Sequence, residues 1–380
     1  MLTASPVLPD ASPAAPRLDR KAIAEIVASG RRLLVQGAMG IHASDGVAGK
    51  VAAHRGDRLV GVGTISAVLK TPEHLRAEIR RAKAEAPGGY VGVNIMAAIH
   101  KGDFESHVRV SIEEGVSFIV QGAGISREIV RWCREGGIPF VGIVSSGRLA
   151  AMYEKWGAEW IVAEGAEAGG HIGDIGHPLP SLLDEVIAST SLPVVAAGGV
   201  DASDVSRLLA AGAAGVQLAT RFLACADGDV HPAFKDMHLR RGEQDVAIIT
   251  SCVKGMKARA VRNAFTDKLA RGEAVPPRSK AWWFGREGYL GRRKACIECL
   301  ATDLCKCRAS NFQESFCITD ALLAAAVKGD TENGLFYTGQ SLVRIGDRDV
   351  ASLPTAREIL EGLEALLAGE AAAPRAALAG

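Results

Sequence analysis

Eight short apolar runs, separated by longer amphipathic stretches, constrain the fold of this chain more than any other feature of its sequence. Continuous runs of Val, Ile and Leu are typical of strands that are buried on both faces of a parallel sheet. The stretches between them, such as 72–86 and 204–213, place apolar residues on one helical face. The sequence therefore predicts repeated β/α units. The runs are RLLVQ (32–36), RLVGVG (58–63), YVGVNI (90–95), SFIVQ (117–121), PFVGIV (139–144), WIVAEG (160–165), PVVAAGG (193–199) and GVQLAT (215–220).

The glycine-rich turns help to decide between the two architectures that such units can form. A doubly wound open sheet of the dinucleotide-binding type carries its glycine-rich phosphate loop after the first strand. Here the richest glycine turns follow the sixth and seventh runs, in EAGGHIG and AAGGV. Barrels often bind phosphate through the loops after strands seven and eight. We therefore expect an α/β fold of the (β/α)8 TIM barrel type rather than an open sheet.

The segments on either side of the eight runs differ from them in composition. The first residues, MLTASPVLPDASPAAP, are rich in Pro, Ala and Ser without a hydrophobic period, and EAAAPRAALAG at the other end is similar. After residue 225 the β/α pattern stops, and the stretches 255–272 and 355–369 are both expected to be helical. The expected division is a flexible tail at 1–16, a (β/α)8 barrel at 17–225, a C-terminal cap segment at 226–369 with a Cys-rich stretch at 296–317, and a flexible tail at 370–380.

Charge and composition argue against several classes of function. The 380 residues include 44 Lys and Arg and 43 Asp and Glu, so a formal net charge of +1 provides no field that attracts nucleic acid or an anionic membrane. No stretch approaches the roughly 20 apolar residues that span a bilayer, and the first residues lack a basic region followed by an apolar run. We expect a cytoplasmic protein that acts on a small molecule, and the sequence leaves a homo-oligomeric state open.

The strongest local signal for chemistry is a glycine-rich loop, residues 163–173, at the end of the sixth run. The carboxyl ends of barrel strands form the catalytic face. Gly169 and Gly170 lack side chains, so a flat ring or a phosphate can approach the backbone there. His171 follows them, and a histidine that titrates near neutral pH suits general acid/base work, so we predict that it is the catalytic residue. Structural roles are expected for His42, His177 and His231, which lack this context.

A second signal predicts a phosphate site. Gly198 and Gly199 follow the seventh run, and the segment 217–221 ends the eighth. Backbone N–H groups on two neighbouring barrel loops can hold one phosphate, helped by the N-terminus of a following helix. Thr220 can add a hydroxyl donor. We therefore predict that these two loops together bind a phosphate group.

A third and weaker signal lies at the ends of the first and third runs. QGAMG (36–40) follows the first run, and Asn94 stands near the end of the third. The small residues Ala38 and Gly40 would let a flavin ring lie against the backbone, and Met39 would pack on its apolar part. This segment is expected to complete a cofactor site.

Three segments in this order and spacing, QGAMG, AEGAEAGGHIG and PVVAAGGV followed by GVQLATRFLA, resemble the nitronate monooxygenase family, formerly called 2-nitropropane dioxygenases. They also resemble the related FMN-dependent enoyl-acyl-carrier-protein reductases. The resemblance covers about residues 30–225, and EAGGH is its most specific part. Both groups are FMN-binding barrels, so the resemblance implies FMN as cofactor and agrees with the fold and the phosphate site argued above.

The resemblance also implies roles for matching positions. His171 matches the family histidine that abstracts the proton next to a nitro group, or that donates a proton in the reductases. Glu164 matches a flavin-contacting position that is often Gln in the monooxygenases and Glu in the reductases, so this residue keeps the reductase alternative open. The positions expected to bind the cofactor are Ala38, Met39, Gly40, Asn94, Glu164, Gly169, Gly170, Gly198, Gly199, Gln217, Leu218, Ala219 and Thr220.

Three functions are compatible with these signals. The expected one is FMN-dependent oxidation of alkyl nitronates or nitroalkanes with O2. In the alternative, NAD(P)H reduces the flavin, and an enoyl thioester on an acyl carrier protein receives the hydride. A flavin-binding protein without turnover is disfavoured, because a pure binder has no need of a titratable group such as His171 beside the ring. In each case the redox chemistry belongs to the flavin, and the protein supplies positioning and electrostatics.

The cysteines are unevenly distributed. Their spacing in the dense part of the chain matches neither two CxxC pairs nor an evenly spaced CxxCxxC run, so a bound metal is the less favoured interpretation. A redox-active pair and reduced structural thiols in the cap segment are the alternatives. Scattered cysteines are Cys133, Cys225 and Cys252, and the dense group is Cys296, Cys299, Cys305, Cys307 and Cys317.

Overall fold

The computed structural model describes residues 13–40, 45–68, 70–97, 101–239, 241–253, 255–273, 275, 316–345 and 349–372. Its centre is a closed barrel of parallel strands in the order β1-β2-β3-β4-β5-β6-β8-β9, with β9 hydrogen-bonded to β1. Each strand falls on one of the predicted apolar runs, so the (β/α)8 TIM barrel is confirmed. The strands are β1 (Arg32–Gln36), β2 (Leu59–Ser66), β3 (Tyr90–Ile95), β4 (Ile119–Gln121), β5 (Phe140–Val144), β6 (Trp160–Glu164), β8 (Val194–Ala197) and β9 (Gly215–Leu218).

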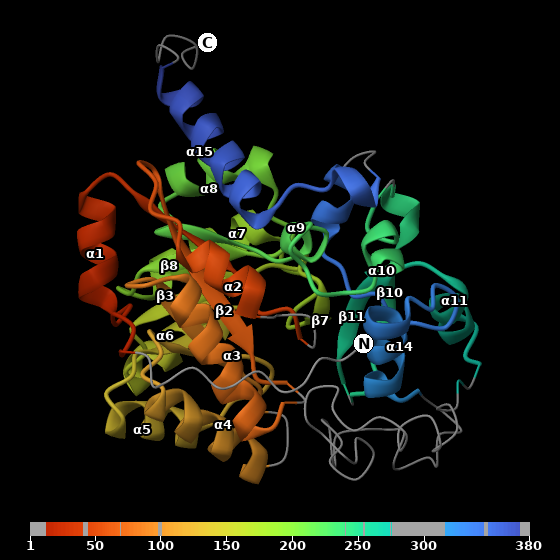
Figure 1. Ribbon diagram of the computed structural model, residues 1–380, viewed down its shortest axis with the longest axis horizontal. Helices are drawn as coiled ribbons and strands as arrows, with labels where there is room; N and C mark the ends of the chain where they lie inside the picture. The colour runs from red at the N-terminus through yellow and green to blue at the C-terminus, as the bar shows by residue number, and fades with distance from the viewer. Residues whose placement is uncertain are drawn as a thin grey trace.

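Helices surround the barrel and follow its strands in the chain (Figure 1). The predicted helix at 72–86 is α3 (Pro72–Glu85), which begins where Thr71 Oγ1 accepts a hydrogen bond from the His74 N–H. The predicted helix at 204–213 is shorter in the structure. A 3-10 turn (Ala202–Asp204) comes first, and α8 (Val205–Ala210) follows it. The other helices of this ring are α2 (Asp45–Ala52), α4 (Lys101–Glu113), α5 (Arg127–Glu135), α6 (Gly147–Trp156), α7 (Leu179–Ser189) and α9 (Thr220–Leu223).

Alternation along the strands divides the apolar residues into two clusters. One cluster, which includes Leu33 and Trp160, lies inside the barrel. Leu18 and α1 (Arg20–Ala28) belong to this cluster, and the Leu18 carbonyl accepts a hydrogen bond from Trp160 Nε1 at 3.1 Å. The other cluster, which includes Leu34, lies between the strands and the helices. Both faces of the strands are therefore buried, which explains why the sequence shows continuous apolar runs.

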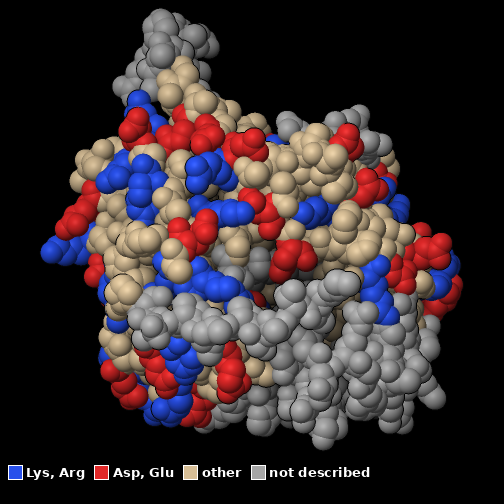
Figure 2. Space-filling view, viewed as in Figure 1, with Lys and Arg blue, Asp and Glu red and all other residues tan. Residues whose placement is uncertain are grey.

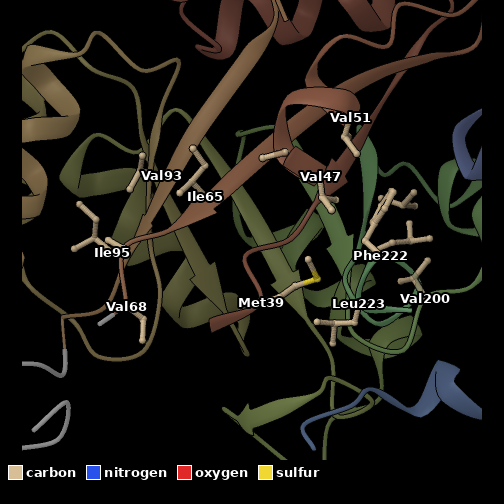
Figure 3. Packing of buried hydrophobic residues seen from close by; sticks show 14 of the residues in the cluster. Met39, Val47, Val51, Ile65, Val68, Val93, Ile95, Val200, Phe222 and Leu223 are labelled. Carbon is tan, nitrogen blue, oxygen red and sulfur yellow. The ribbon is translucent and has the colours of Figure 1, made fainter. Parts of the chain in front are cut away.

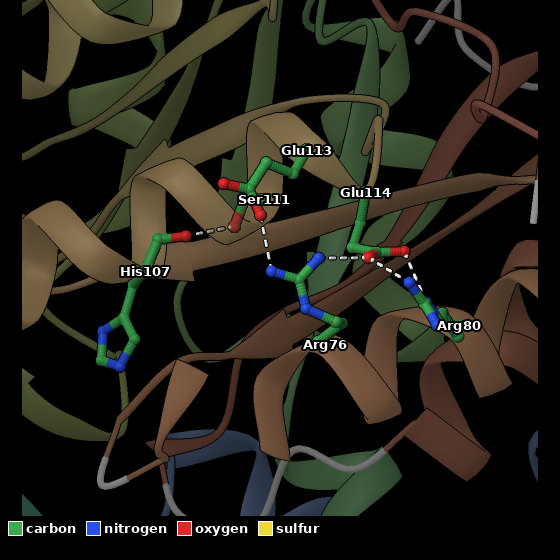
Figure 4. A network of polar contacts seen from close by, with 6 residues as sticks. All are labelled: Arg76, Arg80, His107, Ser111, Glu113 and Glu114. Atoms are coloured by element: carbon green, nitrogen blue, oxygen red, sulfur yellow. Dashed lines mark hydrogen bonds and ion pairs between the residues drawn. The ribbon is translucent and has the colours of Figure 1, made fainter. Parts of the chain in front are cut away.

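Charged side chains join α3 to the end of α4 (Figure 4). Glu114 is buried and accepts hydrogen bonds from Arg80 Nε and Nη2 at 2.9 Å each, and from Arg76 Nη1 at 2.5 Å. Burial by itself raises the pKa of Glu114, but the hydrogen bonds from Arg80 and Arg76 outweigh burial and hold that pKa below its ordinary value. These charges therefore serve to hold two helices together.

A second, three-stranded sheet lies beside the barrel, in the order β10-β11-β7 (Figure 1), and we call it the cap sheet. The prediction of a helix over 255–272 is wrong in its first half, where alternate residues Ala258 and Ala260 are fully buried as in a strand. A helix, α11 (Ala264–Ala270), begins only after Asn263, whose side chain accepts a hydrogen bond from the Thr266 N–H. The strands are β7 (Gly170–Ile172), β10 (Val246–Thr250) and β11 (Lys257–Val261).

The C-terminal helix returns to the barrel. The helix predicted at 355–369 is α15 (Ala356–Ala372), which lies against α2 (Figure 1). The Glu364 carboxylate accepts hydrogen bonds from the backbone N–H groups of Arg58 at 3.0 Å and Leu59 at 2.8 Å. The residues after 225 therefore cover more than one side of the barrel. The remaining helices among the described residues are α10 (Pro232–Asp236), α14 (Ile318–Lys328), and the 3-10 turns Glu243–Asp245, Gln340–Arg344 and Val350–Ser352.

The surface carries mixed charge. Figure 2 shows Lys and Arg interspersed with Asp and Glu over the described part of the visible face. This mixture agrees with the formal net charge of +1. Within the described ranges, no helix is both long enough and apolar enough to cross a membrane.

Glycines in β2 allow α2 to pack directly on the strand. A Cβ added at Gly61 would lie 1.9 Å from the carbonyl oxygen of Val51. We expect Gly61→Ala to lower the free energy of unfolding by about 1–3 kcal/mol, because a backbone shift is needed to relieve the overlap. Gly362→Ala is the control, since that helical glycine has no neighbour within 4 Å and alanine should stabilise by about 0.5–1 kcal/mol. Urea unfolding measures both, and equal effects would contradict this account of the packing.

Candidate functional site

A cavity of about 250 Å³ opens where the barrel strands end and the cap residues approach them. Its apolar side includes Met39 and Leu223, which Figure 3 shows on the same side of the buried cluster, whereas Val68 lies on the other. The cavity brings together nearly all of the predicted site residues from distant parts of the sequence. Those that line it are Ala38, Met39, Gly40, Asn94, Glu164, Gly169, Gly170, His171, Gly198, Gly199, Gln217, Ala219 and Thr220.

Leu218 is the predicted cofactor-binding residue that does not line the cavity. Its side chain is 2% exposed and belongs to the apolar cluster between the strands and the helices. Successive side chains of a strand point to opposite faces, so Gln217 faces the cavity while Leu218 faces the helices. Only the backbone of Leu218 is placed to approach a ligand.

The loop after β6 is held between the barrel and the cap. Arg259 of β11 donates hydrogen bonds from Nη1 to the carbonyls of Ala166 at 2.6 Å and Ala168 at 2.5 Å. A Cβ at Gly169 would lie 2.5 Å from the carbonyl carbon of Thr338, so the two backbones are in direct contact. The sequence predicted that glycine here permits close approach, and the structure shows that part of this approach is by the protein's own cap.

His171 lies in a strand and not in an open loop. It belongs to β7, where its backbone pairs with Ala258 of β11. Its Nε2 is 2.7 Å from Ser251 Oγ, and the ring of Tyr337 packs edge-on against the imidazole with centroids 5.7 Å apart. Burial lowers the pKa of His171 to about 4, because the charged imidazolium is poorly solvated there. The side chain is therefore a neutral imidazole at pH 7, the form that can accept a proton.

The pKa of Glu164 is shifted in the opposite direction. This residue ends β6 and lines the same cavity as His171. Burial raises the pKa of Glu164 to about 7, because the carboxylate is the form that loses solvation. At neutral pH a substantial part of the population is protonated, and a protonated carboxyl can donate a hydrogen bond. Two groups whose pKa values are displaced by burial in one cavity are typical of a functional site.

The predicted phosphate loops meet at one end of the cavity. Gly198 and Gly199 have φ angles of 99° and 65°, a region that favours glycine. The Thr220 Oγ1 accepts a hydrogen bond from the Gly339 N–H at 2.9 Å, which leaves its own hydroxyl proton free to be donated. The helix that follows, α9, spans only four residues, so its N-terminus adds little to this end of the cavity.

Residues after 225 complete the cavity, and the sequence reasoning missed them. Tyr337, Thr338, Gly339 and Ser341 form one wall, and α14 adds an apolar wall that includes Ile318. The only signal that could have found them is the run of hydroxyl residues around a glycine at 337–341. No hydrophobic period connects that run to the barrel, so its contact with the site follows from tertiary packing alone.

The other histidines and the cysteines that the structure describes do not line the cavity. His177 Nε2 is 3.3 Å from the Glu185 carboxylate, and His231 Nδ1 accepts a hydrogen bond from the Ala233 N–H at the start of α10. Both therefore have structural contacts, while His42 lies outside the described residues. Burial raises the pKa of Cys133 to about 12 and is the main cause that raises that of Cys225 to about 11. Cys252 and Cys317 are also buried and form no disulfide with a described residue, and the predicted group Cys296, Cys299, Cys305 and Cys307 lies outside the described residues.

Comparison with known proteins identifies the family. The model of the nitronate monooxygenase family matches residues 24–365. The chain belongs to the nitronate monooxygenase family. The match extends past the barrel into the residues after 225, beyond the segments that carry the resemblance. The chain is therefore a flavin-type oxidoreductase of this family, as its fold and its relatives agree.

Relatives of this chain carry more than one activity in their names. It is 32% identical to the Mycobacterium tuberculosis "(3aS,4S,5R,7aS)-5-hydroxy-7a-methyl-1-oxo-octahydro-1H-indene-4-carboxyl-CoA dehydrogenase", over 80% of this chain and 85% of that protein. A probable nitronate monooxygenase of Staphylococcus aureus is 32% identical over 48% of this chain and 54% of that protein. The solved structure of FabK from Thermotoga maritima has a TM-score of 0.71 and 26% identity, over 92% of this chain and 96% of that one.

Replacement of Glu164 by Gln tests the raised pKa. Below about pH 4.5, the ordinary pKa of a glutamate, the Glu164 carboxyl is protonated in the folded and the unfolded chain alike. In that range its ionisation does not change the free energy of unfolding. As pH rises through about 7 the unfolded chain has already lost the proton that the folded chain retains, so wild-type stability falls relative to Glu164→Gln. We expect the variant to gain about 1–3 kcal/mol between pH 4.5 and pH 8. Urea unfolding of both flavin-free proteins measures this, and a pH-independent difference would contradict the assignment.

Proposed function

We propose that this chain is an FMN-dependent oxidoreductase that takes a proton from a substrate carbon next to an electron-withdrawing group, with His171 as the base. One observation carries the proposal: a neutral His171 lines the same cavity as the paired glycines 198 and 199. A titratable base and a candidate phosphate site on the catalytic face of a barrel favour a phosphorylated cofactor beside the reacting atoms.

The residues present fit FMN. Gly198 packs directly on the loop after β6, since a Cβ there would lie 2.9 Å from the Gly165 nitrogen, so Gly198 and Gly199 add backbone without side chains to the cavity wall. Thr220 would donate its hydroxyl proton to the phosphate, and the amides of Asn94 and Gln217 would bond the polar edge of the ring. A single candidate phosphate site favours FMN, which carries one phosphate, over FAD, which carries two. FMN would supply electron acceptance and reaction with oxygen, whereas the protein supplies the base and the orientation.

Nitronates and nitroalkanes are the first proposed substrates. A nitro group acidifies the neighbouring carbon, so a base of low pKa can remove the α-proton when the resulting anion stays beside it. His171 would accept that proton, and a preformed nitronate would not need this step. The proposed partners are the small-molecule substrate and O2, in a cytoplasmic setting.

A thioester substrate is the second candidate, and the length of the matches favours it. The relative named as a CoA-ester dehydrogenase is matched over 85% of its length, whereas the probable nitronate monooxygenase is matched over 54%. Glu164 also agrees with the reductase pattern of the resemblance. In this alternative NAD(P)H would reduce the flavin, the thioester of CoA or an acyl carrier protein would be the substrate, and His171 would exchange the proton at the carbon next to the thioester.

Release of the cofactor tests the first part of the proposal. We expect purified protein to be yellow and to release FMN, and not FAD, on denaturation. Gly198→Ala should reduce FMN affinity at least about tenfold, because the new Cβ would overlap the Gly165 backbone and displace the loops that would hold the phosphate. Gly212→Ala is matched in backbone strain, with φ of 102° against 99°, but lies away from the cavity and should retain FMN. Mass spectrometry of the released flavin and fluorescence titration measure these results, and a protein that binds no flavin would refute the proposal.

Replacement of His171 tests the base. His171→Ala should retain FMN and lose about 10²–10⁴-fold in turnover of a neutral nitroalkane, the usual contribution of a general base. Oxidation of the preformed nitronate should change much less, since no proton has to be removed. Oxygen consumption with each substrate measures the two rates. Equal turnover of nitroalkane by wild type and variant would remove the assigned role.

The two substrate classes are separated by anaerobic mixing of the FMN-loaded protein with single reductants. Loss of flavin absorbance with a nitronate, and none with NADH or NADPH, would support the nitronate substrate. Loss of absorbance with a pyridine nucleotide, followed by recovery on addition of an enoyl thioester, would support the second candidate. Full turnover then compares CoA and carrier-protein thioesters of the same acyl group.

A further inference from the structure

The hydroxyl of Ser251 contacts Nε2 of His171, and this serine has no part in the function proposed above. Ser251, which directly follows β10, is 2% exposed and places its Oγ 2.7 Å from Nε2. The backbone N–H of Val253 donates a hydrogen bond to the same Oγ at 3.0 Å. Ser251 is therefore held in place by its own turn and faces the catalytic ring.

The hydrogen bond between Ser251 and His171 can run in either of two directions, and these have opposite consequences for the imidazole. A serine oxygen has two lone pairs and one proton, and Val253 uses one of the lone pairs. The serine can accept a proton from Nε2–H, which leaves the lone pair of the imidazole on Nδ1. It can instead donate its own proton to Nε2, which leaves Nδ1 protonated and occupies the only lone pair of the neutral ring. Only the first direction, in which Ser251 accepts, leaves a basic lone pair of the imidazole that faces away from Ser251.

The surroundings of Tyr337 favour the direction in which Ser251 accepts the hydrogen bond from His171. The Tyr337 hydroxyl is buried without a hydrogen bond of standard geometry to any described side chain. Burial and the neighbouring Cys252 raise the pKa of this phenol, and Ser251 acts on that pKa in the opposite direction. A buried unsatisfied hydroxyl costs about 1–3 kcal/mol, and a serine proton turned toward the phenol oxygen would reduce that cost, whereas a proton turned toward the imidazole would not. The remaining lone pair of Oγ then faces His171.

We propose that Ser251 is a positioning residue that accepts a hydrogen bond from Nε2–H of His171 and so places the basic lone pair on Nδ1. This inference rests on the proposed role of His171 as base. In the proton transfer, Nδ1 forms a bond to the α-proton, and the C–H electron pair stays on the substrate as its nitronate or enolate anion. The imidazolium formed keeps Nε2–H bonded to Ser251, so the ring need not turn during the step.

Nitrogen NMR tests the tautomer directly. Protein labelled with ¹⁵N-histidine contains nine histidines, and the His171 signals are those lost in His171→Gln. Long-range proton–nitrogen correlations in the flavin-loaded protein should show neutral His171 protonated on Nε2. Ser251→Ala should shift the population toward Nδ1–H, while Ser251→Thr, which retains a hydroxyl, should keep the native tautomer. An Nδ1–H tautomer in the native protein would overturn the proposal whatever the kinetic role of His171, and this readout separates its failure from that of the proposed function.

Kinetics supply the second readout. Ser251→Ala should lower kcat about 10–100-fold with little change in KM, as is usual when the partner that orients a functional histidine is lost, and Ser251→Thr should recover most of it. Ser111→Ala is the matched control, because that fully buried serine donates to the backbone carbonyl of His107 at 2.7 Å (Figure 4) and contacts no site residue. It should leave kcat and the His171 tautomer unchanged. An equal loss in both variants, or a change in KM alone, would overturn the positioning role.

Discussion

The antiparallel pairing of β7 with β11 is the contact on which the candidate site depends. A loop after a barrel strand is ordinarily held by the two elements that it joins. Here Gly170 pairs with Arg259 and His171 with Ala258, so the loop after β6 is also held in its middle by the cap sheet. The Arg259 guanidinium bonds two further carbonyls of the same loop. The position of His171 is therefore set by the cap as much as by the barrel, and a barrel without the cap sheet would present the histidine on an unsupported loop.

This arrangement explains why glycines are concentrated around the cavity. Gly169 touches the backbone at Thr338, and Gly198 touches the backbone at Gly165, so three chain segments meet with no side chain between them. Backbone that is packed so closely presents flat surfaces and N–H groups in place of side chains. Such a surface suits a planar ring and a phosphate, but it supplies no acid or base. The reactive groups must then come from the few side chains that enter the cavity, which gives His171 and Glu164 their importance.

The barrel and half of the site could be predicted from the sequence because both follow from local patterns. Strands that are buried on both faces leave continuous apolar runs, and a glycine pair before His171 marks a loop at the catalytic end of a strand. The cap sheet left no such pattern: β11 alternates alanines with Lys257 and Arg259, which resemble the face of a basic helix in sequence and form a strand because β7 and β10 pair with it. Ser251 and Tyr337 could not be found for the same reason, since their contact with His171 is made between elements that are distant along the chain.

Burial shifts the pKa values of His171 and Glu164 in opposite directions, and these shifts constrain how the proposed reaction could proceed. With a pKa of about 4, His171 is neutral at pH 7. An anion formed from the substrate beside the ring would raise that pKa, because opposite charges attract strongly where water is excluded. Proton removal would then be favourable only for substrates whose anion is stable and stays in the cavity, such as a nitronate or a thioester enolate. A partly protonated Glu164 would compete less for the imidazolium than a full carboxylate would. The substrate anion would then be an important partner of the imidazolium, and selectivity for acidic carbon would follow from the burial of the site.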